Sequence, residues 1–471
     1  MAGGCRTGVI WYRRDLRIAD HLGLAAASQL CDAVLPVYIV SNWSQHHNWT
    51  GSKRQQFLCD CLTSLAAGLR ELGGRLIIRS GPPLDAIRAL LIESRAEILF
   101  FQKDPDPHGQ RVEAALSAMC ATMGVKVHSF HDVSLLGSEE VLTAENMPYR
   151  VYTPFSKNWL AREKPKPVPT IPSLRTPPDI ASEELPTLAT WGLAPENGPQ
   201  LAAGENAAQQ RFEIALHQRI GQYHDRRDIP AVTGTSRISQ DLRFGLISLR
   251  SIAAELSDAI KSASPAERTG IHTFLKELAW REFYFAILAH FPEVLQEEFS
   301  PQWRGLPWDE PDEKLLAWQS GTTGFPIVDA GMRELHATGF MHNRVRMVTA
   351  MFFTKDLHYD WRIGESWFMQ HLLDGEIASN NGGWQWSAGT GADAAPYFRI
   401  QNPWTQTARH DPEGIYIKRW IPELADVDAR KFHSPPGNKP LAPDYPLPIL
   451  DHDTERLRCL EIFKHHKARQ Q

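Results

Sequence analysis

The chain has few cysteines for its length. Only six of its 471 residues are cysteine, and five of these precede residue 121. So sparse a set excludes a disulfide framework and is typical of free thiols in a reducing compartment. An iron–sulfur cluster needs four thiolates, and the C-terminal half offers only Cys459. We therefore expect neither disulfides nor a metal site.

Long apolar runs are also missing. Residues 1–6 lead straight into a strand-like segment, 9–12, without an apolar signal region of adequate length. Hydrophobic residues make up 42% of the chain and charged residues 22%, which is typical of a globular protein away from membranes. We expect a cytoplasmic protein that makes no membrane contact, and we expect it to be a monomer.

Excess positive charge is absent as well. The formal net charge is −5, so the overall field gives no reason to expect nucleic acid, and any contact with DNA must come from a local patch. Scattered arginines are usually ordinary solvated surface. The arginines that could form such a patch are Arg226, Arg227, Arg281, Arg344, Arg346 and Arg399.

Residues 1–133 alternate short β-branched runs with helical patterns, which predicts a doubly wound parallel sheet. The turn after the first strand, residues 13–17, contains no glycine. It therefore lacks the phosphate-binding turn of a dinucleotide fold, and a nicotinamide cofactor is not expected. The expected strands are 9–12, 33–40, 75–78, 97–101 and 125–130.

The rest of the chain changes character twice. Residues 134–200 are rich in proline, which predicts an extended interdomain linker. From 201 to 471 helical periodicity dominates, so we expect an all-α second domain. The most regular helical patterns cover 205–223, 248–262, 271–289 and 331–354.

The most distinctive segment is 380–390, with the sequence NNGGWQWSAGT. It combines two adjacent asparagines with two tryptophans, which structural demands do not explain well. The acidic turn 374–376 precedes it and the segment 393–399 (DAAPYFR) follows. Together they resemble the flavin-facing signature of the photolyase and cryptochrome family, and the resemblance extends over nearly the whole chain. It implies an α/β antenna domain followed by a helical domain that binds one FAD.

The resemblance assigns FAD to segments that lie far apart in the chain. Alone, residues 233–239 (TGTSRIS) read as a hydroxyl-rich cap before a helix, but such a start also binds phosphate, and the family holds the diphosphate there. Asp374 would lie against the flavin with Arg344 and tune its electrostatics. Asn380 would face flavin N5, where a neutral amide favours the reduced cofactor. The implied FAD contacts are Tyr223, Thr235, Ser236, Arg237, Ile238, Ser239, Phe274, Arg344, Asp374, Gly375, Glu376 and Asn380. Because all of them follow residue 201, we expect removal of residues 1–133 to leave them intact.

Three of the 15 tryptophans stand in contexts that match an electron relay. Tryptophan usually serves as bulky core, and that interpretation suits most of the others. The resemblance places Trp384 nearest the flavin, Trp361 next and Trp308 outermost, so that an electron can pass from the surface to the cofactor.

The pattern around residues 277–284 puts Glu277, Trp280, Arg281 and Tyr284 on one helix face. This face could be a plain amphipathic boundary, but it resembles the lesion-binding helix of the family. There Glu277 would hydrogen-bond thymine and protonate or stabilise the dimer radical anion, and Trp280 would stack on the extruded bases. The implied DNA contacts are Arg227, Glu277, Trp280, Arg281, Tyr284, Asn343, Arg344, Met347 and Trp386.

Residues 342–347 (HNRVRM) bear on the substrate. The (6-4) photolyases bring histidines to the lesion, whereas the corresponding positions here are Asn343 and Met347. The resemblance thus implies light-driven repair of cyclobutane pyrimidine dimers in UV-damaged DNA, with Glu277, Asn343 and Asn380 as catalytic residues. We expect His342 to be a packed or capping residue.

Two alternatives to a repair enzyme stay open. A cryptochrome would use the same flavin without repair, although its plant and animal members usually carry a long C-terminal tail that this chain lacks after the helical segment 454–467. A light-independent flavoprotein would have no DNA-facing helix. The antenna chromophore is also open, because residues 101–109 lack the Asn-Glu pair of folate-binding relatives. Methenyltetrahydrofolate, 8-hydroxydeazaflavin or an empty pocket are the candidates.

Overall fold

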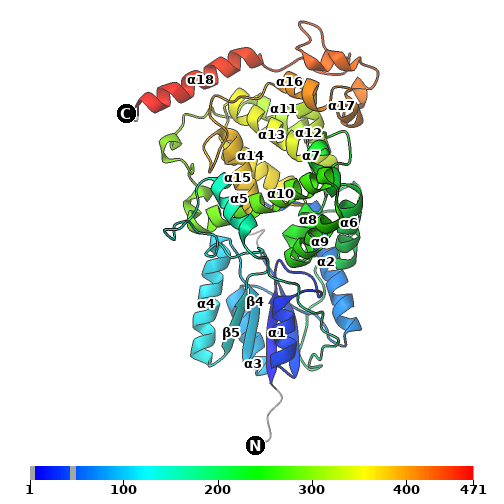
Figure 1. Ribbon diagram of the computed structural model, residues 1–471, viewed down its shortest axis with the longest axis vertical. Coiled ribbons are helices and arrows are strands. Elements are labelled where there is room, and N and C mark those ends of the chain that lie inside the picture. The colour runs from blue at the N-terminus through cyan, green and yellow to red at the C-terminus, as the bar shows by residue number, and fades with distance from the viewer. Residues whose placement is uncertain (1–5, 43–48, 199, 470–471) are drawn as a thin grey trace, which may run out of the picture.

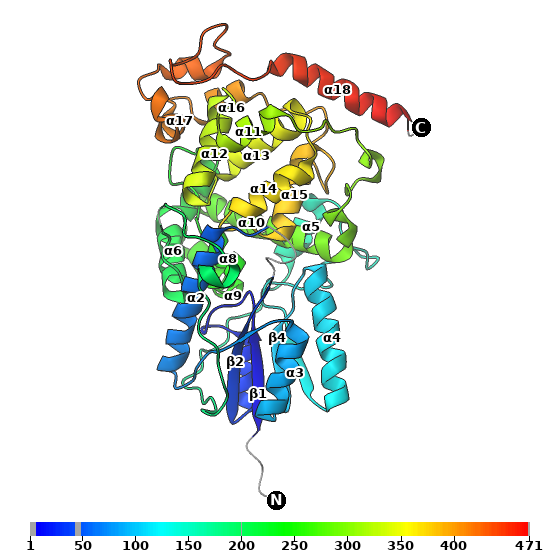
Figure 2. The same ribbon diagram turned by 180° about the vertical axis from the view of Figure 1, so that it is seen from behind.

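The structure, a computed structural model, describes residues 6–42, 49–198 and 200–469. An α/β part lies at one end of an elongated molecule and a larger helical part lies at the other (Figures 1 and 2). Helix α18 (His452–Arg469) crosses the end that is farthest from the N-terminus. The predicted fold class, a parallel α/β domain followed by a helical domain, is confirmed.

Five parallel strands form the sheet, in the order β3-β2-β1-β4-β5. Every strand lies within two residues of its predicted bounds. The central strands β1 and β4 are almost entirely buried, because helices cover both faces of the sheet. The strands are β1 (Thr7–Tyr12), β2 (Ala33–Val40), β3 (Ile77–Ser80), β4 (Ile98–Gln102) and β5 (Lys126–Phe130), and the helices are α1 (Leu22–Leu30), α2 (Ser52–Glu71), α3 (Pro83–Ser94) and α4 (Pro107–Met123).

The order of the sheet reverses between β1 and β4, and the carboxyl ends of these two strands point towards the helical part (Figure 1). Such a switch point is where open α/β sheets usually present functional side chains. Arg13 and Arg14 follow β1, and Lys103 and Asp104 follow β4. Charged side chains of the first part therefore face the second.

The connection 134–200 is only partly extended. No helix or strand lies between 162 and 187, as its prolines predict, but α5 (Tyr152–Ala161) and a 3-10 turn, η2 (Leu188–Trp191), interrupt it. The prediction of an extended linker is wrong for α5. Tyr152, Phe155 and Trp159 are spaced by three and four, so they form a buried helical stripe that precedes the proline run.

The second part is helical, as predicted. Its elements are α6 (Glu205–Gln218), η3 (Ile220–Gln222), α7 (Tyr223–Arg226), α8 (Ser239–Phe244), α9 (Leu249–Ser262), α10 (Pro265–His290), η4 (Pro292–Leu295), η5 (Pro301–Trp303), α11 (Glu313–Ser320), α12 (Pro326–Thr338), α13 (Asn343–Met351), the π-helical turn η6 (Phe352–Asp356), α14 (Trp361–His371), α15 (Ile377–Ala388), α16 (Pro403–His410), α17 (Ile415–Trp420), η7 (Pro422–Leu424), η8 (Ala429–His433) and α18. Within the described ranges, no helix is both long and apolar enough to cross a membrane. The described cysteines are free thiols: Cys31, Cys59, Cys61, Cys120 and Cys459.

The single helix predicted over 331–354 is wrong. Gly339 has φ +70° and ends α12 in the left-handed conformation that glycine adopts easily. His342 then caps α13, because its Nδ1 accepts a hydrogen bond from the backbone N–H of Arg344 at 3.2 Å. The apolar period runs through this break, so the pattern alone did not reveal it.

One hydrophobic core spans both parts of the molecule. Leu16 and Phe57 of the first part pack in the same cluster as Phe244 and Leu246 of the second. The Phe57 and Phe244 ring centroids are 5.4 Å apart. A second core lies wholly in the helical part around Trp318, Trp361 and Trp384.

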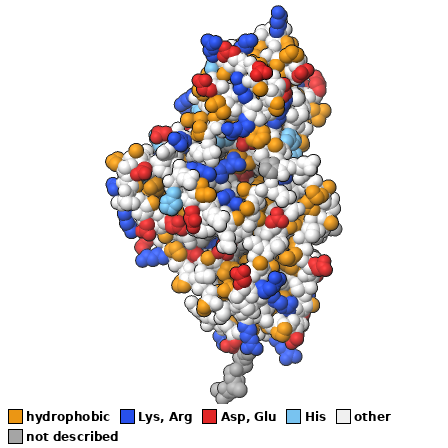
Figure 3. Space-filling view, turned by 90° about the vertical axis from the view of Figure 1, so that its right-hand side faces the viewer, with side chains coloured by type: hydrophobic (Ala, Val, Ile, Leu, Met, Phe, Trp, Pro, Cys, Tyr) orange, Lys and Arg blue, Asp and Glu red, His pale blue; other side chains and the backbone are white. Residues whose placement is uncertain are grey.

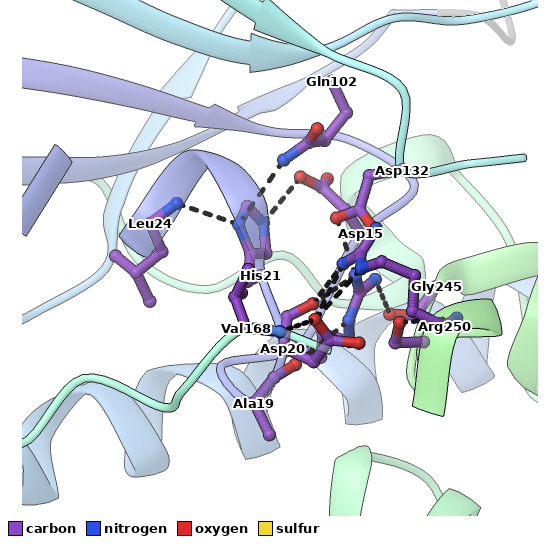
Figure 4. Close-up of polar contacts among 12 residues, drawn as sticks. Asp15, Ala19, Asp20, His21, Leu24, Gln102, Asp132, Val168, Gly245 and Arg250 are labelled. Atoms are coloured by element: carbon purple, nitrogen blue, oxygen red, sulfur yellow. Dashed lines mark hydrogen bonds and ion pairs between the residues drawn. The ribbon is translucent and has the colours of Figure 1, made fainter. Parts of the chain in front are cut away.

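Buried ion pairs tie the two parts together at the same junction (Figure 4). Asp132, which follows β5, pairs with Arg17 at 2.6 Å and with Arg250 of α9 at 2.6 Å. Arg250 also reaches Asp20 at 3.0 Å. All four side chains are at most 5% exposed, so each charge depends on its partners.

Candidate functional site

A cavity of about 470 Å³ lies in the helical part between α8, α10, α13 and α15. Lysine and arginine side chains gather at a hollow in the middle of the face that Figure 3 shows. Most of the residues predicted to bind FAD or DNA line this one cavity. They are Tyr223, Arg227, Ser236, Ile238, Ser239, Phe274, Glu277, Trp280, Arg281, Tyr284, Asn343, Met347, Asp374, Gly375, Glu376, Asn380, Trp384 and Trp386.

Five predicted residues are not part of the lining: Thr235, Arg237, Arg344, Trp308 and Trp361. Arg237 has φ +60°, a left-handed conformation that turns the chain between Gly234 and α8. Its guanidinium lies 3.5 Å from the Phe340 ring centroid, so its side chain points elsewhere.

Helix α10 presents the predicted face to the cavity. Glu277, Trp280, Arg281 and Tyr284 all line it, as their spacing predicts. Trp280 stacks on Tyr152 of α5 with ring centroids 3.6 Å apart and planes 9° from parallel. This stack fixes an indole at the wall of the cavity, where a flat aromatic ligand could contact it.

The carboxylate of Glu277 accepts a hydrogen bond from Arg227. Burial raises the pKa of Glu277 above its ordinary value, although the charge and hydrogen bond of Arg227 oppose the rise. A carboxyl group in this environment is easier to protonate than one on the surface.

The contacts of helix α13 differ in one respect from the expected flavin environment. Asn343, Arg346 and Met347 line the cavity, and Arg346 pairs with Asp374 at 2.9 Å. Arg344 lies on another face of the helix and pairs with Asp228 at 2.8 Å. Asn343 and Arg346 are three residues apart, so helical spacing was a signal that favoured Arg346 over Arg344.

His342 is buried and caps α13, as expected of a packed or capping residue. Burial lowers the pKa of its imidazole to about 4, so it is neutral at physiological pH. Its Nε2 has no hydrogen-bond partner among the described residues.

Among the described residues, the hydrogen bonds of two arginines at the cavity go to backbone carbonyls. Arg243 donates from Nε to the carbonyl of Gly375 at 2.8 Å, and Arg281 donates to Val133 at 2.9 Å. Burial lowers the pKa of each guanidinium to about 10. Within the part of the chain that the structure describes, neither forms an ion pair. The hydroxyl-bearing Ser236 and Ser239 line the same cavity. This combination fits an anionic group such as a diphosphate.

Helix α15 carries the asparagines and tryptophans of the distinctive segment. Asn380 donates from Nδ2 to the backbone carbonyl of Glu365 at 3.0 Å, which fixes the orientation of its amide. Asn381 donates to the Glu365 carboxyl group at 3.1 Å, and burial raises the pKa of that group to about 8. At neutral pH, Glu365 is therefore mainly protonated and adds no negative charge behind Asn380.

The wall formed by α15 leaves room for a large ring system. A Cβ added at Gly383 would meet no other atom within 4 Å. The indole Nε1 of Trp384 is buried and has no hydrogen-bond partner among the described residues. An open wall beside an unused donor, together with two unpaired arginines, fits the size and chemistry of FAD.

The first part of the chain also reaches this site. Arg14 pairs with Glu376 at 3.1 Å, and Arg54 donates to the carbonyl of Gly375 at 3.0 Å. The expectation that removal of residues 1–133 leaves the FAD contacts formally intact stays a prediction, because every lining residue follows residue 201, but the removal would also take away two arginines that hold the acidic turn. The carboxyl end of β1 delivers Arg14 directly to the acidic turn of the cavity, and no local sequence signal indicates such a contact.

The three tryptophans of the expected relay differ in their relation to the cavity and in exposure. Trp384 lines the cavity, Trp361 is fully buried at the start of α14, and Trp308 is half-buried. The Trp384 ring lies on Gly364, one turn along α14 from Trp361, and a Cβ there would come within 2.1 Å of the ring. Trp318 also contacts Trp384, with ring centroids 6.2 Å apart.

A second, smaller cavity of about 230 Å³ lies between the two parts of the molecule. The segment that follows β4 contributes Lys103, Asp104 and Glu113 to it, and Glu282 of α10 closes the other side. It is the cavity next to the segment considered for an antenna chromophore.

Known proteins share this architecture throughout the chain. A family model described as DNA photolyase matches residues 8–173, and one described as the FAD binding domain of DNA photolyase matches residues 274–465. A deoxyribodipyrimidine photo-lyase from Synechococcus sp. is 37% identical over 98% of this chain and 97% of its own. The chain therefore belongs to the DNA photolyase family, and its helical part is an FAD-binding domain.

Two solved structures show how far the fold is shared. A class III photolyase from Agrobacterium tumefaciens has a TM-score of 0.92 at 34% identity and covers 99% of both chains. A Synechocystis cryptochrome has a TM-score of 0.89 at 27% identity and covers 98% of this chain and 100% of its own. A photolyase and a cryptochrome thus share this fold, and function has to be argued from the cavity.

Proposed function

We propose that the protein repairs cyclobutane pyrimidine dimers in UV-damaged DNA, using light and reduced FAD bound in the large cavity. One observation carries the proposal: the segment that would face the flavin and the expected lesion-binding face of α10 line the same cavity. The bound cofactor would supply a photoexcited electron to the lesion and take it back. The proposed FAD contacts are the predicted ones that line the cavity. Arg243 and Arg346, which also line it, are added, and Thr235, Arg237 and Arg344 are omitted.

The chain itself would bind and orient the flipped-out dimer. Trp280, held by its stack on Tyr152, offers a flat surface for the bases. Glu277, whose pKa is raised by burial, can hold a proton and donate it in a hydrogen bond to thymine. Asn343 hydrogen-bonds without supplying a ready proton, and Met347 offers a soft apolar contact, which favours cyclobutane dimers over (6-4) products.

Relatives support the same function. The Synechococcus protein at 37% identity is named deoxyribodipyrimidine photo-lyase, as is an Escherichia coli protein at 36% identity. We extend that activity to this chain as a proposal, with UV-damaged DNA as its partner.

The decisive experiment illuminates purified, chemically reduced protein with an oligonucleotide that contains one thymine dimer. Recovery of thymine absorbance at 260 nm in the light, and none in the dark, is the expected result. Comparison with an oligonucleotide that carries a (6-4) product tests the preference. Faster repair of the (6-4) product, or no light-dependent recovery of the dimer, would overturn the proposal.

The second candidate is a photoreceptor without repair activity, which the likeness to the Synechocystis cryptochrome favours. This candidate predicts flavin photochemistry without thymine recovery in the same experiment. The antenna candidates, methenyltetrahydrofolate and 8-hydroxydeazaflavin, are distinguished by the absorption spectrum of the chromophores released from purified protein.

A further inference from the structure

Four charged side chains form a continuous series of ion pairs, and two of them, Arg227 and Glu277, line the large cavity. Arg227 bonds to Glu277 through Nη1, and its Nε lies 3.8 Å from the carboxylate of Asp228. The same Asp228 oxygen pairs with Arg344 at 2.8 Å. The charges alternate in sign along this series, so each of the two arginines is paired with an acidic side chain of the protein.

In this series of charged side chains, Asp228 lies between two guanidinium groups, where a phosphate could also bind. Its side chain is 40% exposed, whereas that of Arg344 is 17% exposed. Burial acts against its ionisation, but Arg344 and Arg227 together keep the pKa of Asp228 below its ordinary value. An exposed anion between two guanidiniums can be replaced by a phosphate oxygen, which binds the same donors and carries comparable charge.

We propose that Asp228 is a positioning residue that occupies the place of a phosphate beside Arg227 and Arg344 in the DNA-free protein, and that a DNA phosphate displaces it, draws Arg227 away from Glu277 and lets Glu277 bind a proton. This inference rests on the proposed function, because it assumes that DNA approaches the mouth of the cavity. It makes the ionisation of Glu277 depend on whether DNA is present.

The surroundings of Glu277 favour this coupling. Besides Arg227, the charged and titratable groups that act on it are Asp228 and Arg344, and the phenols of Tyr152, Tyr223 and Tyr284. Arg227 and Arg344 lower the pKa of Glu277, whereas burial and Asp228 raise it. If Arg227 moves to a phosphate, Glu277 stays buried but loses the cation that most favours its ionised form. Its carboxyl group then takes up a proton.

The sign of the pH dependence follows from linkage. The pKa of Glu277 is higher in the complex than in the free protein, so binding takes up a proton. The dissociation constant should therefore rise with pH between the two values, by at most about tenfold per pH unit. His410 also interacts with Asp228 and Arg344, so the source of the slope has to be assigned by mutation.

The test measures the dissociation constants of dimer-containing and undamaged oligonucleotides from pH 5.5 to 8.5 at constant salt. Wild type should show the slope with both DNAs, because undamaged DNA also supplies a phosphate. Glu277→Gln should lose it, and so should Arg227→Met, which keeps Glu277 but removes the group that switches its environment. A slope that persists in Arg227→Met, or in Glu277→Gln, overturns the coupling.

A second comparison tests Asp228 directly. Asp228→Asn removes the internal competitor and should tighten binding of undamaged DNA about fivefold, whereas Asp228→Glu keeps the competitor and should behave like wild type. Asp225→Asn in α7 is the matched control, because it makes the same charge change and Asp225 joins no ion pair in the described ranges. Equal tightening in Asp228→Asn and Asp225→Asn, or weaker binding in Asp228→Asn, overturns the role of Asp228.

Failure of this inference can be told apart from failure of the proposed function. The pH slope and the effect of Asp228 are read in the dark and on undamaged DNA. A protein that shows both but restores no thymine absorbance in the light has the coupling without the repair activity. A protein that repairs dimers without any pH slope has the activity without the coupling.

Discussion

Charged side chains are paired at the junction between the two parts of the molecule, whereas at the large cavity two arginines lack an acidic partner among the described residues. At the junction, Asp132 has Arg17 and Arg250 within 2.6 Å, and every charge of the group is paired. At the cavity, Arg243 and Arg281 are only partly buried, form no ion pair within the described ranges and donate hydrogen bonds to backbone carbonyls. The contrast separates charges that complete the fold from charges that stay available for an anionic ligand, because an unpaired charge partly shielded from water gains free energy when such a ligand binds.

The largest effect is expected at the junction. Asp132→Asn keeps the volume but leaves the guanidiniums of Arg17 and Arg250 without their shared partner. The free energy of unfolding should fall by about 3–5 kcal/mol, the usual cost of an uncompensated buried charge. Chemical denaturation followed by circular dichroism measures it. A loss below about 1 kcal/mol would place this group among ordinary surface ion pairs and remove the contrast with the cavity.

The opposite outcome is expected for Arg243→Met in the cavity. Loss of one charge-assisted contact to a diphosphate costs roughly 1.5–3 kcal/mol, so FAD affinity should fall by about 10- to 100-fold. The flavin-free protein should not lose stability, because the substitution removes an unpaired charge. Titration of flavin-free protein with FAD measures the affinity.

Arg17→Met is the matched control for that experiment, because it makes the same substitution at the junction. It should destabilise the protein and leave the FAD contacts in place. If Arg243→Met instead destabilises the flavin-free protein as much as Arg17→Met, the two regions do not differ in the way that we infer.

His342 extends the comparison to a buried group that stays neutral. Its pKa is lowered by burial from 6.5 to about 4, so its contribution to stability is complete above pH 6.5 and is lost as the pH falls towards 4. Between pH 7 and pH 5 this loss amounts to about 2 kcal/mol. His342→Asn keeps a side-chain acceptor at the N-cap and cannot titrate, so its unfolding free energy should vary less over this range. Identical pH profiles for the two proteins would show that His342 is not the group responsible.

The last contrast concerns Trp384, which brings an aromatic ring but no charge to the cavity. Trp384→Phe keeps most of the ring bulk but is much harder to oxidise. Light-driven reduction of oxidised FAD should collapse, whereas repair by chemically reduced protein should persist. Both are measured in one preparation, by flavin bleaching with an external reductant and by thymine recovery after dithionite.

Trp318→Phe is the control for Trp384→Phe, because Trp318 also contacts Trp384 but lies outside the expected relay. It should leave photoreduction unchanged. Normal photoreduction in Trp384→Phe would show that this residue serves only as core.

The sequence predicted well where one element carries the whole signal. The sheet was predicted because each strand is a short apolar run, and the α10 face because residues spaced by three and four share a side of a helix. The period of 331–354 was misleading, since the left-handed Gly339 interrupts the backbone without interrupting the apolar pattern. Arg344 was chosen over Arg346 by resemblance, although helical spacing favoured Arg346.

Contacts between distant segments could not be predicted in this way. Arg14 and Glu376 are 362 residues apart in the chain. Nothing in the sequence around either residue distinguishes it from an ordinary surface residue. Asp228, in the turn after α7, pairs with Arg344 of α13. Such pairs depend on how distant segments pack in three dimensions, which periodicity does not encode.

The shared core and buried ion pairs at the junction have an optical consequence. Energy transfer between two chromophores falls steeply with their separation and depends on the relative orientation of their transition dipoles. A single core that includes Leu16 and Phe244, locked by Asp132 and Arg250, fixes both quantities for any pigment held by the first part of the chain. Its efficiency as a light collector would then be set by side-chain packing at the junction and not by a flexible tether.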